Sequence, residues 1–152
     1  MNICLVASRG GHLEELCFAQ KLNGTVFLIT EKAACVTADY KRVYYVDHIN
    51  RKEPNVIWKM IKLFWRAANI LKQEQPDCFV STGALISIPV LLLGKLRRKK
   101  IIFIETLARV ETPSISGRIA YRFADVFIVY WKSLFEFYPK AIYIDLFSED
   151  TE

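Results

Sequence analysis

Short runs of consecutive apolar residues alternate along the chain with longer segments in which apolar residues recur every three or four positions. The first pattern is typical of strands buried on both faces, and the second is typical of helices that bury one side. We predict strands at residues 2–7, 25–30, 42–46, 77–81, 100–104 and 126–129, with a further candidate at 141–144. We predict helices at residues 12–21, 56–73, 85–96 and 114–123, and a short one around 132–137.

This alternation predicts the fold class. Apolar strands separated by helices indicate a parallel sheet with helices on both faces, and right-handed crossovers then favour a Rossmann-like, doubly wound α/β sheet. The chain has 152 residues, which suffices for one domain with a substantial core. Because no repeat or linker-like segment divides the sequence, we expect residues 1–152 to form a single domain.

The composition combines a high apolar content with positive charge. Hydrophobic residues make up 53% of the chain, and the formal net charge is +5. This combination fits an anionic membrane surface better than a nucleic acid, for which the sequence holds no recognition motif. The longest charge-free run, residues 78–93, is shorter than the ~20 apolar residues that span a bilayer, and it contains Pro89. The cysteines are scattered without ligand spacing, so we expect no metal and no cofactor.

The first predicted strand leads directly into Ser8-Arg9-Gly10-Gly11-His12 and a helical pattern. A helix that opens just after a strand gathers free backbone N–H groups where phosphates bind, and glycines let the backbone approach such a ligand. A neutral His12 can act as a general base or hydrogen-bond a sugar hydroxyl. The alternative is that His12 only caps the helix or touches the sheet.

Two later loops belong at the same edge of the predicted sheet, where ligands bind beyond the strand ends. Ser81, Thr82 and Gly83 suggest a second anion cradle, although a simple helix start needs the same residue types. Glu105 ends an apolar strand. Its carboxylate can act as a base, bind a hydroxyl or form an ion pair with Arg109.

A dinucleotide site is the obvious competing interpretation. Glu31 follows the glycines by about 20 residues, where a ribose-binding acid belongs. The G-x-G-x-x-G spacing is missing, however, and Glu14 falls near the position of the third glycine. We therefore exclude redox chemistry with a nicotinamide dinucleotide.

The segment 55–73 carries more apolar surface than a single core-facing stripe requires, together with cations at helical spacing. Tryptophan beside lysine on a broad apolar face is typical of a helix in the headgroup region of a membrane, and the basic cluster 97–100 repeats this composition. The alternative is a packed core helix with a solvated basic edge. The predicted membrane-contact residues are Trp58, Lys59, Lys62, Trp65, Arg66, Arg97 and Arg98.

These motifs together resemble a known family. The resemblance rests on Gly10-Gly11-His12, on Ser81-Thr82-Gly83-Ala84, on Glu105 with Arg109, and on Phe137-Tyr138-Pro139 near the end. In this order they resemble the bacterial PssD-type exopolysaccharide and capsule proteins. Those are similar to the acceptor-side, membrane-associated subunit of the two-component UDP-N-acetylglucosamine transferase of lipid-linked oligosaccharide synthesis, and distantly to the N-terminal half of MurG, a GT-B glycosyltransferase.

The resemblance implies a split enzyme whose activity requires a second, small subunit that binds the UDP-sugar. This chain would bind a polyprenyl-diphosphate-linked sugar and lie peripherally on the cytoplasmic face of the plasma membrane. His12 and Glu105 would be catalytic. The diphosphate would be bound by Ser8, Arg9, Gly10, Gly11, Ser81, Thr82, Gly83 and Arg109. The alternative is a non-catalytic membrane adaptor that recruits and activates its partner.

Overall fold

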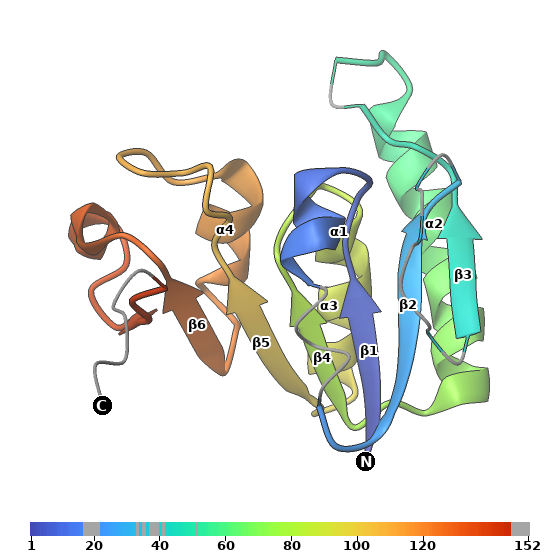
Figure 1. Cartoon of the computed structure of the whole chain (residues 1–152). Coiled ribbons are helices and arrows are strands. Elements are labelled where there is room, and N and C mark those ends of the chain that lie inside the picture. The colour runs from blue at the N-terminus through green and yellow to red at the C-terminus, as the bar shows by residue number, and fades with distance from the viewer. Residues whose placement is uncertain are drawn as a thin grey trace.

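The computed structural model describes residues 1–16, 22–32, 34, 36, 40, 42–50 and 52–146. Its strands form one seven-stranded sheet in the order β3-β2-β1-β4-β5-β6-β7 (Figure 1). Every neighbouring pair is parallel. The strands are β1 (Asn2–Val6), β2 (Thr25–Glu31), β3 (Arg42–Val46), β4 (Cys78–Ser81), β5 (Lys100–Ile104), β6 (Val126–Val129) and β7 (Ile142–Tyr143).

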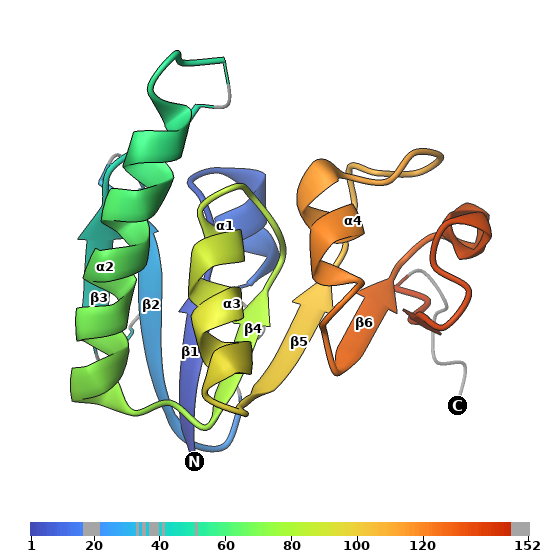
Figure 2. The same ribbon diagram turned by 180° about the vertical axis from the view of Figure 1, so that it is seen from behind.

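Helices cover both faces of this sheet. Figure 2 shows α2, α3 and α4 together on one face, and Figure 1 shows α1 on the opposite face. The described helices are α1 (Gly11–Glu15), α2 (Val56–Glu74), α3 (Ser87–Leu96), α4 (Ile115–Ala120) and the 3-10 helix η2 (Lys132–Glu136). This arrangement confirms the prediction of a Rossmann-like, doubly wound α/β sheet.

The core has two layers because successive side chains of a strand point to opposite faces. In β1, Cys4 and Val6 pack into the cluster beneath α2 and α3, together with Leu71 and Leu91. Ile3 and Leu5, whose side chains point to the opposite face, belong to the cluster on the α1 side. Two-sided burial explains why the strands read as uninterrupted apolar runs.

The start of α3 and both ends of α4 differ from the prediction, and other described helix ends differ from it by one residue. Helix α3 begins at Ser87 rather than at residue 85, because Leu85 and Ile86 form a tight turn in which the Ser87 N–H donates to the Ala84 carbonyl at 3.2 Å and the Ile88 N–H to the Leu85 carbonyl at 3.4 Å. Helix α4 begins at Ile115, since Ser114 is its N-cap and accepts a hydrogen bond from the Gly117 N–H. It ends at Ala120 instead of residue 123. For α1, the predicted segment 17–21 lies outside the described residues.

None of the helices described here combines the length and the apolar character that crossing a bilayer requires.

Gly94 fixes how closely α3 approaches the sheet, so Gly94→Ala should destabilise the fold. A Cβ at Gly94 would lie 2.7 Å from the Phe79 ring and 2.9 Å from the Ile101 side chain. We expect a loss of about 1–3 kcal/mol in unfolding free energy, as for other overpacked sites, although alanine is the better helix former. Urea unfolding followed by circular dichroism measures this change. The control is Leu96→Ala on the same helix, because Leu96 is exposed. Equal stability of G94A and the unaltered chain would contradict the packing argument.

Candidate functional site

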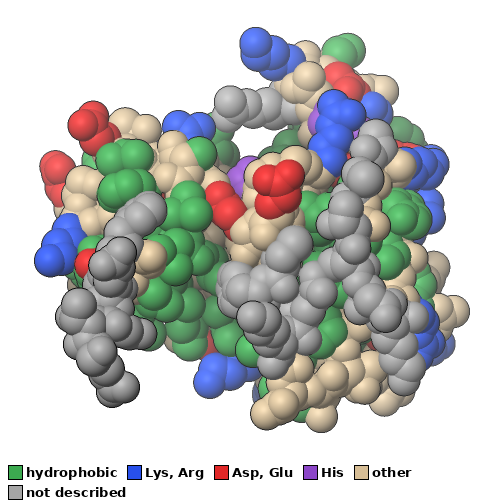
Figure 3. Space-filling model, in the orientation of Figure 1, with side chains coloured by type: hydrophobic (Ala, Val, Ile, Leu, Met, Phe, Trp, Pro, Cys, Tyr) green, Lys and Arg blue, Asp and Glu red, His purple; other side chains and the backbone are tan. Residues whose placement is uncertain are grey.

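A polar cleft of about 380 Å³ lies at the carboxyl edge of the sheet. The segments that follow β1, β3, β4 and β5 line it, as expected for a parallel sheet whose strands all end at one edge. In the space-filling view, His side chains border the hollow at the top of the face shown (Figure 3). The lining residues are His12, His48, Ile49, Asn50, Ala84, Leu85, Thr106, Arg109, Ser114, Ile115 and Ser116.

His12 is held at the cleft by a reciprocal pair of hydrogen bonds with Thr82. The Thr82 hydroxyl donates to the carbonyl oxygen of His12 at 2.6 Å, and the Nδ1 atom of His12 lies 2.9 Å from the carbonyl oxygen of Thr82. A carbonyl oxygen only accepts, so Nδ1 carries a proton, and Nε2 of the neutral ring is a base. This geometry supports the predicted role of His12.

The hydroxyl groups of the loop after β4 form hydrogen bonds within the protein and do not line the cleft. The Ser81 side chain is buried and its Oγ accepts from the Gly83 N–H at 3.1 Å. The Thr82 hydroxyl is occupied by His12. Gly83 lies beneath the His12 ring, since a Cβ there would be 3.4 Å from Cε1 of His12. The prediction that these three residues bind a diphosphate is therefore not supported: they position His12 instead.

Glu105 also has a structural role in this geometry. The residue is 1% exposed, and its carboxylate accepts hydrogen bonds from the N–H groups of Thr106 and Ser114 and from the Tyr138 hydroxyl. It therefore fixes the N-terminus of α4, where a negative charge is favourable. Among the described residues it forms no ion pair with Arg109. The prediction that Glu105 is catalytic is not supported, because a buried and fully bonded carboxylate does not reach a substrate.

Burial and the neighbouring Glu105 carboxylate raise the pKa of Tyr138 well above its usual range, so this hydroxyl stays a donor. Gly117 allows the close packing around this bond, since a Cβ there would lie 2.1 Å from Oε2 of Glu105. The Gly117 position thus requires a residue without a side chain.

Glu15 is a positioning residue that the sequence pattern did not reveal. Its Oε1 atom accepts from the Thr106 hydroxyl at 2.7 Å and from the Leu107 N–H at 3.2 Å. This carboxylate fastens α1 to the loop after β5. A glutamate on a short helix looks like an ordinary solvated side chain in sequence, so no local signal could have identified it.

The glycine-rich turn itself is exposed. Arg9, Gly10 and Gly11 lie beside the cleft lining rather than in it, and Ser8 is half-buried with its hydroxyl 3.4 Å from the Arg9 carbonyl. Nothing lies within 4 Å of a Cβ built at Gly10 or Gly11. Space therefore remains in front of this turn for a ligand, as the prediction of a phosphate site requires.

His48 lines the cleft and was missed by sequence reasoning. It follows β3, and its Nδ1 atom lies 3.0 Å from Oε1 of Glu31 at the end of β2. Glu31 was recognised only as a candidate ribose ligand, whereas the structure pairs it with a histidine. Across the residues described, no group of three or more His, Cys, Asp or Glu side chains is arranged to hold a metal.

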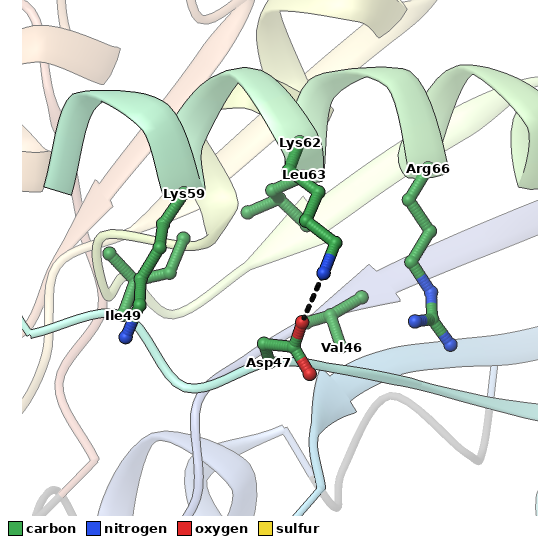
Figure 4. Close-up of a pocket in the computed structure, with 7 residues that line it drawn as sticks. All are labelled: Val46, Asp47, Ile49, Lys59, Lys62, Leu63 and Arg66. Atoms are coloured by element: carbon green, nitrogen blue, oxygen red, sulfur yellow. Dashed lines mark ion pairs between the residues drawn. The ribbon is translucent and has the colours of Figure 1, made fainter. Parts of the chain in front are cut away.

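The predicted membrane residues of α2 divide between two sides of the helix. Figure 4 shows the cationic side chains extending toward the segment that carries Asp47. Lys62 lies 3.5 Å from Asp47, and Lys59 pairs with Glu53. The ammonium of Lys32 holds the pKa of Asp47 below its usual range, and Lys62 contributes to this effect. These cations are therefore partly engaged within the protein.

The other side of α2 is apolar and open to solvent. Trp58 is 71% exposed and Trp65 is 67% exposed, which argues against a fully packed core helix. An apolar groove of about 330 Å³ runs beside them between α2 and α3. Its lining consists of Val56, Ile57, Met60, Ile61, Phe64, Ile88, Pro89 and Leu92.

The basic cluster at the end of α3 belongs to the same surface. The Arg97 guanidinium donates to the Ala68 carbonyl of α2 at 3.3 Å, and both Arg97 and Arg98 are exposed. The two patches that the sequence suggested separately thus meet on neighbouring helices. This contact joins the end of α3 to α2, the helix that carries Trp58 and Trp65.

The fold and the position of the cleft define a class: a Rossmann-like α/β sheet of the kind found in MurG and in UDP-N-acetylglucosamine 2-epimerases. The crystal structure of MurG from Acinetobacter baumannii aligns with a TM-score of 0.68 at 16% identity, over 85% of this chain and 40% of that one. The 2-epimerase from Methanocaldococcus jannaschii aligns with a TM-score of 0.61 at 9% identity, over 88% of this chain and 40% of that one. At these identities the likeness concerns the fold.

Sequence comparison then identifies the family. Residues 28–147 match the family described as "Oligosaccharide biosynthesis protein Alg14 like", and the chain belongs to this family. The human protein named UDP-N-acetylglucosamine transferase subunit ALG14 is 34% identical over 113 residues, covering 66% of this chain and 52% of its own length. The chain thus spans about half the length of this relative.

A bacterial relative carries a more explicit name. A protein of Verminephrobacter eiseniae, named UDP-N-acetylglucosamine--N-acetylmuramyl-(pentapeptide) pyrophosphoryl-undecaprenol N-acetylglucosamine transferase, is 36% identical over 62 residues. The match covers 40% of this chain and 17% of that protein.

Removing the Tyr138 hydroxyl should show that Glu105 is structural. Tyr138→Phe deletes one of the three hydrogen bonds to a buried carboxylate, and we expect a loss of about 1–3 kcal/mol in unfolding free energy. Glu105→Gln should be at least as damaging, because its amide nitrogen would face N–H donors. Thermal unfolding measures both variants. Tyr45→Phe is the control, since Tyr45 is partly exposed. If Glu105→Gln left the stability unaltered but abolished sugar transfer, the result would contradict the structural role and favour a catalytic role for Glu105.

Proposed function

We propose that this chain is the acceptor-binding, membrane-associating subunit of a split UDP-sugar glycosyltransferase. One observation carries the proposal: a polar cleft with a positioned His12 lies next to the apolar α2–α3 groove. The cleft and the groove are neighbours, because Leu85 lines the cleft and Ile88, a few positions later in the chain, lines the groove. A molecule with a polar head and an apolar tail matches this pair of surfaces.

The acceptor in this proposal is a sugar linked to a polyprenyl diphosphate. The names of the relatives support the acceptor class, because the bacterial protein acts by name on a pyrophosphoryl-undecaprenol. The human relative is named a UDP-N-acetylglucosamine transferase subunit, which supports a hexose or N-acetylhexosamine donor bound by a separate small subunit. The resemblance to PssD-type proteins supports an exopolysaccharide or capsule pathway as the destination of the product.

In the proposed mechanism His12 acts on the acceptor hydroxyl. Its Nδ1–H donates to Thr82, so Nε2 is free to accept the hydroxyl proton while the oxygen attacks the sugar carbon of the donor. The bond from that carbon to the diphosphate oxygen breaks in the same step, and UDP leaves with the bonding electrons. The glycine-rich turn leaves space for the diphosphate of the acceptor. Arg109, which is exposed at the cleft, provides a cation for the same anion.

Reconstitution with the donor-binding subunit tests the proposal. Transfer of N-acetylglucosamine from its UDP form to a prenyl-diphosphate-linked sugar should require both chains. His12→Gln should lower kcat by about 10²- to 10⁴-fold, as expected for loss of a general base. Transfer that proceeds equally fast without this chain would contradict the proposal.

A second function is favoured by the structural roles of Ser81, Thr82 and Glu105. With these residues buried, the chain could serve as a membrane adaptor that recruits and activates a catalytic partner. In that case His12→Gln would leave kcat unchanged, while loss of the membrane surface would abolish activity on vesicle-bound acceptor. The same reconstitution therefore separates the two functions.

Membrane association is proposed to use the apolar side of α2 and α3 with the flanking cations, at the cytoplasmic face of the plasma membrane. Replacing Trp58 and Trp65 with serine should lower binding to vesicles of phosphatidylglycerol and phosphatidylethanolamine by about tenfold or more, because interfacial binding scales with buried apolar area. Arg66→Glu should weaken binding to these vesicles, which are anionic because of phosphatidylglycerol, and should leave binding to vesicles without an anionic lipid unchanged. Flotation of vesicles measures both effects.

Ile142→Ser is the matched control for flotation, since Ile142 is 53% exposed but lies on β7, at the other end of the sheet. Unchanged flotation of the double tryptophan variant would show that this surface does not contact the membrane.

A further inference from the structure

We propose that His48, oriented by the buried carboxylate of Glu31, binds the diphosphate of the acceptor through its Nε2 atom. The inference rests on the proposed function for the source of the ligand. It assigns a binding role to a pair of residues that have no role in the mechanism proposed above.

The geometry leaves one polar atom of His48 available. A carboxylate only accepts hydrogen bonds, so Nδ1 of His48, 3.0 Å from Oε1 of Glu31, carries a proton and donates it. The imidazole side chain is 48% exposed and lines the cleft. Nε2 is therefore the remaining polar atom of the ring, and the Glu31 contact restricts how the ring turns.

Glu31 is an unusual residue to bury without a ligand nearby. It is 2% exposed, and within the described part of the chain its Oε2 atom has no hydrogen-bond partner. A buried carboxylate with an unsatisfied oxygen is costly. A charged imidazole offsets this cost by forming an ion pair, and an anion bound on the far side of the ring completes a carboxylate–imidazolium–phosphate arrangement.

The other charged groups around the ring come from separate segments. Glu53, on the segment before α2, interacts electrostatically with His48 but is paired with Lys59. His12 and Arg109 line the same cleft. An anion that reaches Nε2 of His48 therefore meets cationic or hydrogen-bonding groups from three different loops.

Two amide substitutions separate ligand binding from a structural role. In His48→Asn the side-chain nitrogen stands where Nδ1 stood, so the bond to Glu31 can persist while the group at Nε2 is lost. In His48→Gln the nitrogen reaches toward the Nε2 position, and the bond to Glu31 is lost. We expect H48N to weaken diphosphate binding by about 10- to 100-fold, as for a charged hydrogen bond, and H48Q to weaken it less. The opposite order would show that only the Glu31 contact matters and would overturn the proposal.

Nuclear magnetic resonance of the full chain measures this binding without any transfer reaction. The chain has two histidines, so its imidazole signals are assigned with the His48 variants. Inorganic pyrophosphate and farnesyl diphosphate should shift the His48 ring nitrogens toward the doubly protonated form. An unshifted His48 at saturating farnesyl diphosphate would overturn the proposal, whether or not the chain supports transfer.

UDP provides the comparison that identifies the source of the diphosphate. Farnesyl diphosphate should bind more tightly than UDP if the ligand is the acceptor. Tighter binding of UDP at His48 would overturn the acceptor assignment.

In the reconstituted enzyme, H48N should raise the KM for the lipid-linked acceptor and leave the KM for the UDP-sugar unchanged. If transfer fails to depend on this chain while pyrophosphate still binds His48, the proposed function fails and the diphosphate contact stands.

Discussion

All strands of the sheet run in the same direction, and this constraint decides where the molecule can bind a ligand. The carboxyl ends of β1, β3, β4 and β5 meet at one edge, so four separate loops form a single cleft. Parallel strands alone do not hold loops together. The His12–Thr82 pair and the Glu15–Thr106 bond fasten neighbouring loops to each other, and they give the cleft a defined shape.

The polar residues of this edge therefore divide into two groups. Ser81, Thr82 and Glu105 have their side-chain oxygen atoms bonded within the protein, and one carboxylate oxygen of Glu15 is bonded in the same way, so these residues hold backbone and rings in place. Other polar residues, among them His12, His48 and Arg109, line the cleft. Such a division is expected when a site must be preorganised, because a side chain that orients another cannot also change partners when the ligand binds.

The fold could be predicted from the sequence because the strands are buried on both faces. β5 and β6 begin and end as predicted, since each is a nearly uninterrupted apolar run. β3 also begins and ends as predicted, although Arg42 and Tyr45 are exposed on this edge strand. The start of α3 could not be predicted. It depends on a tight turn at Leu85 and Ile86, which follows the positive φ angles of Gly83 and Ala84 and which the apolar sequence does not reveal.

The site could be predicted only in part, for a similar reason. The glycines and His12 form a local signal, and they lie where parallel-sheet logic puts them. Serine and threonine in a loop have the same appearance whether they bind a ligand or their own backbone, and the structure shows the second case for Ser81 and Thr82. His48 has no local signal at all. Its significance comes from Glu31, which approaches it only through the pairing of β2 with β3.

The same topology also explains why a polar cleft and an apolar groove are neighbours. Helices α2 and α3 follow β3 and β4, so both begin at the carboxyl edge where the cleft lies, and both cover one face of the sheet (Figure 2). On one exposed side of these helices the side chains are apolar, and they include Ile57, Ile61 and Leu92. A sugar nucleotide is polar at both ends and gains nothing from such a groove. In the proposed function a lipid diphosphate gains from both surfaces, since its head would occupy the cleft while its chain would remain against α2, α3 and the membrane.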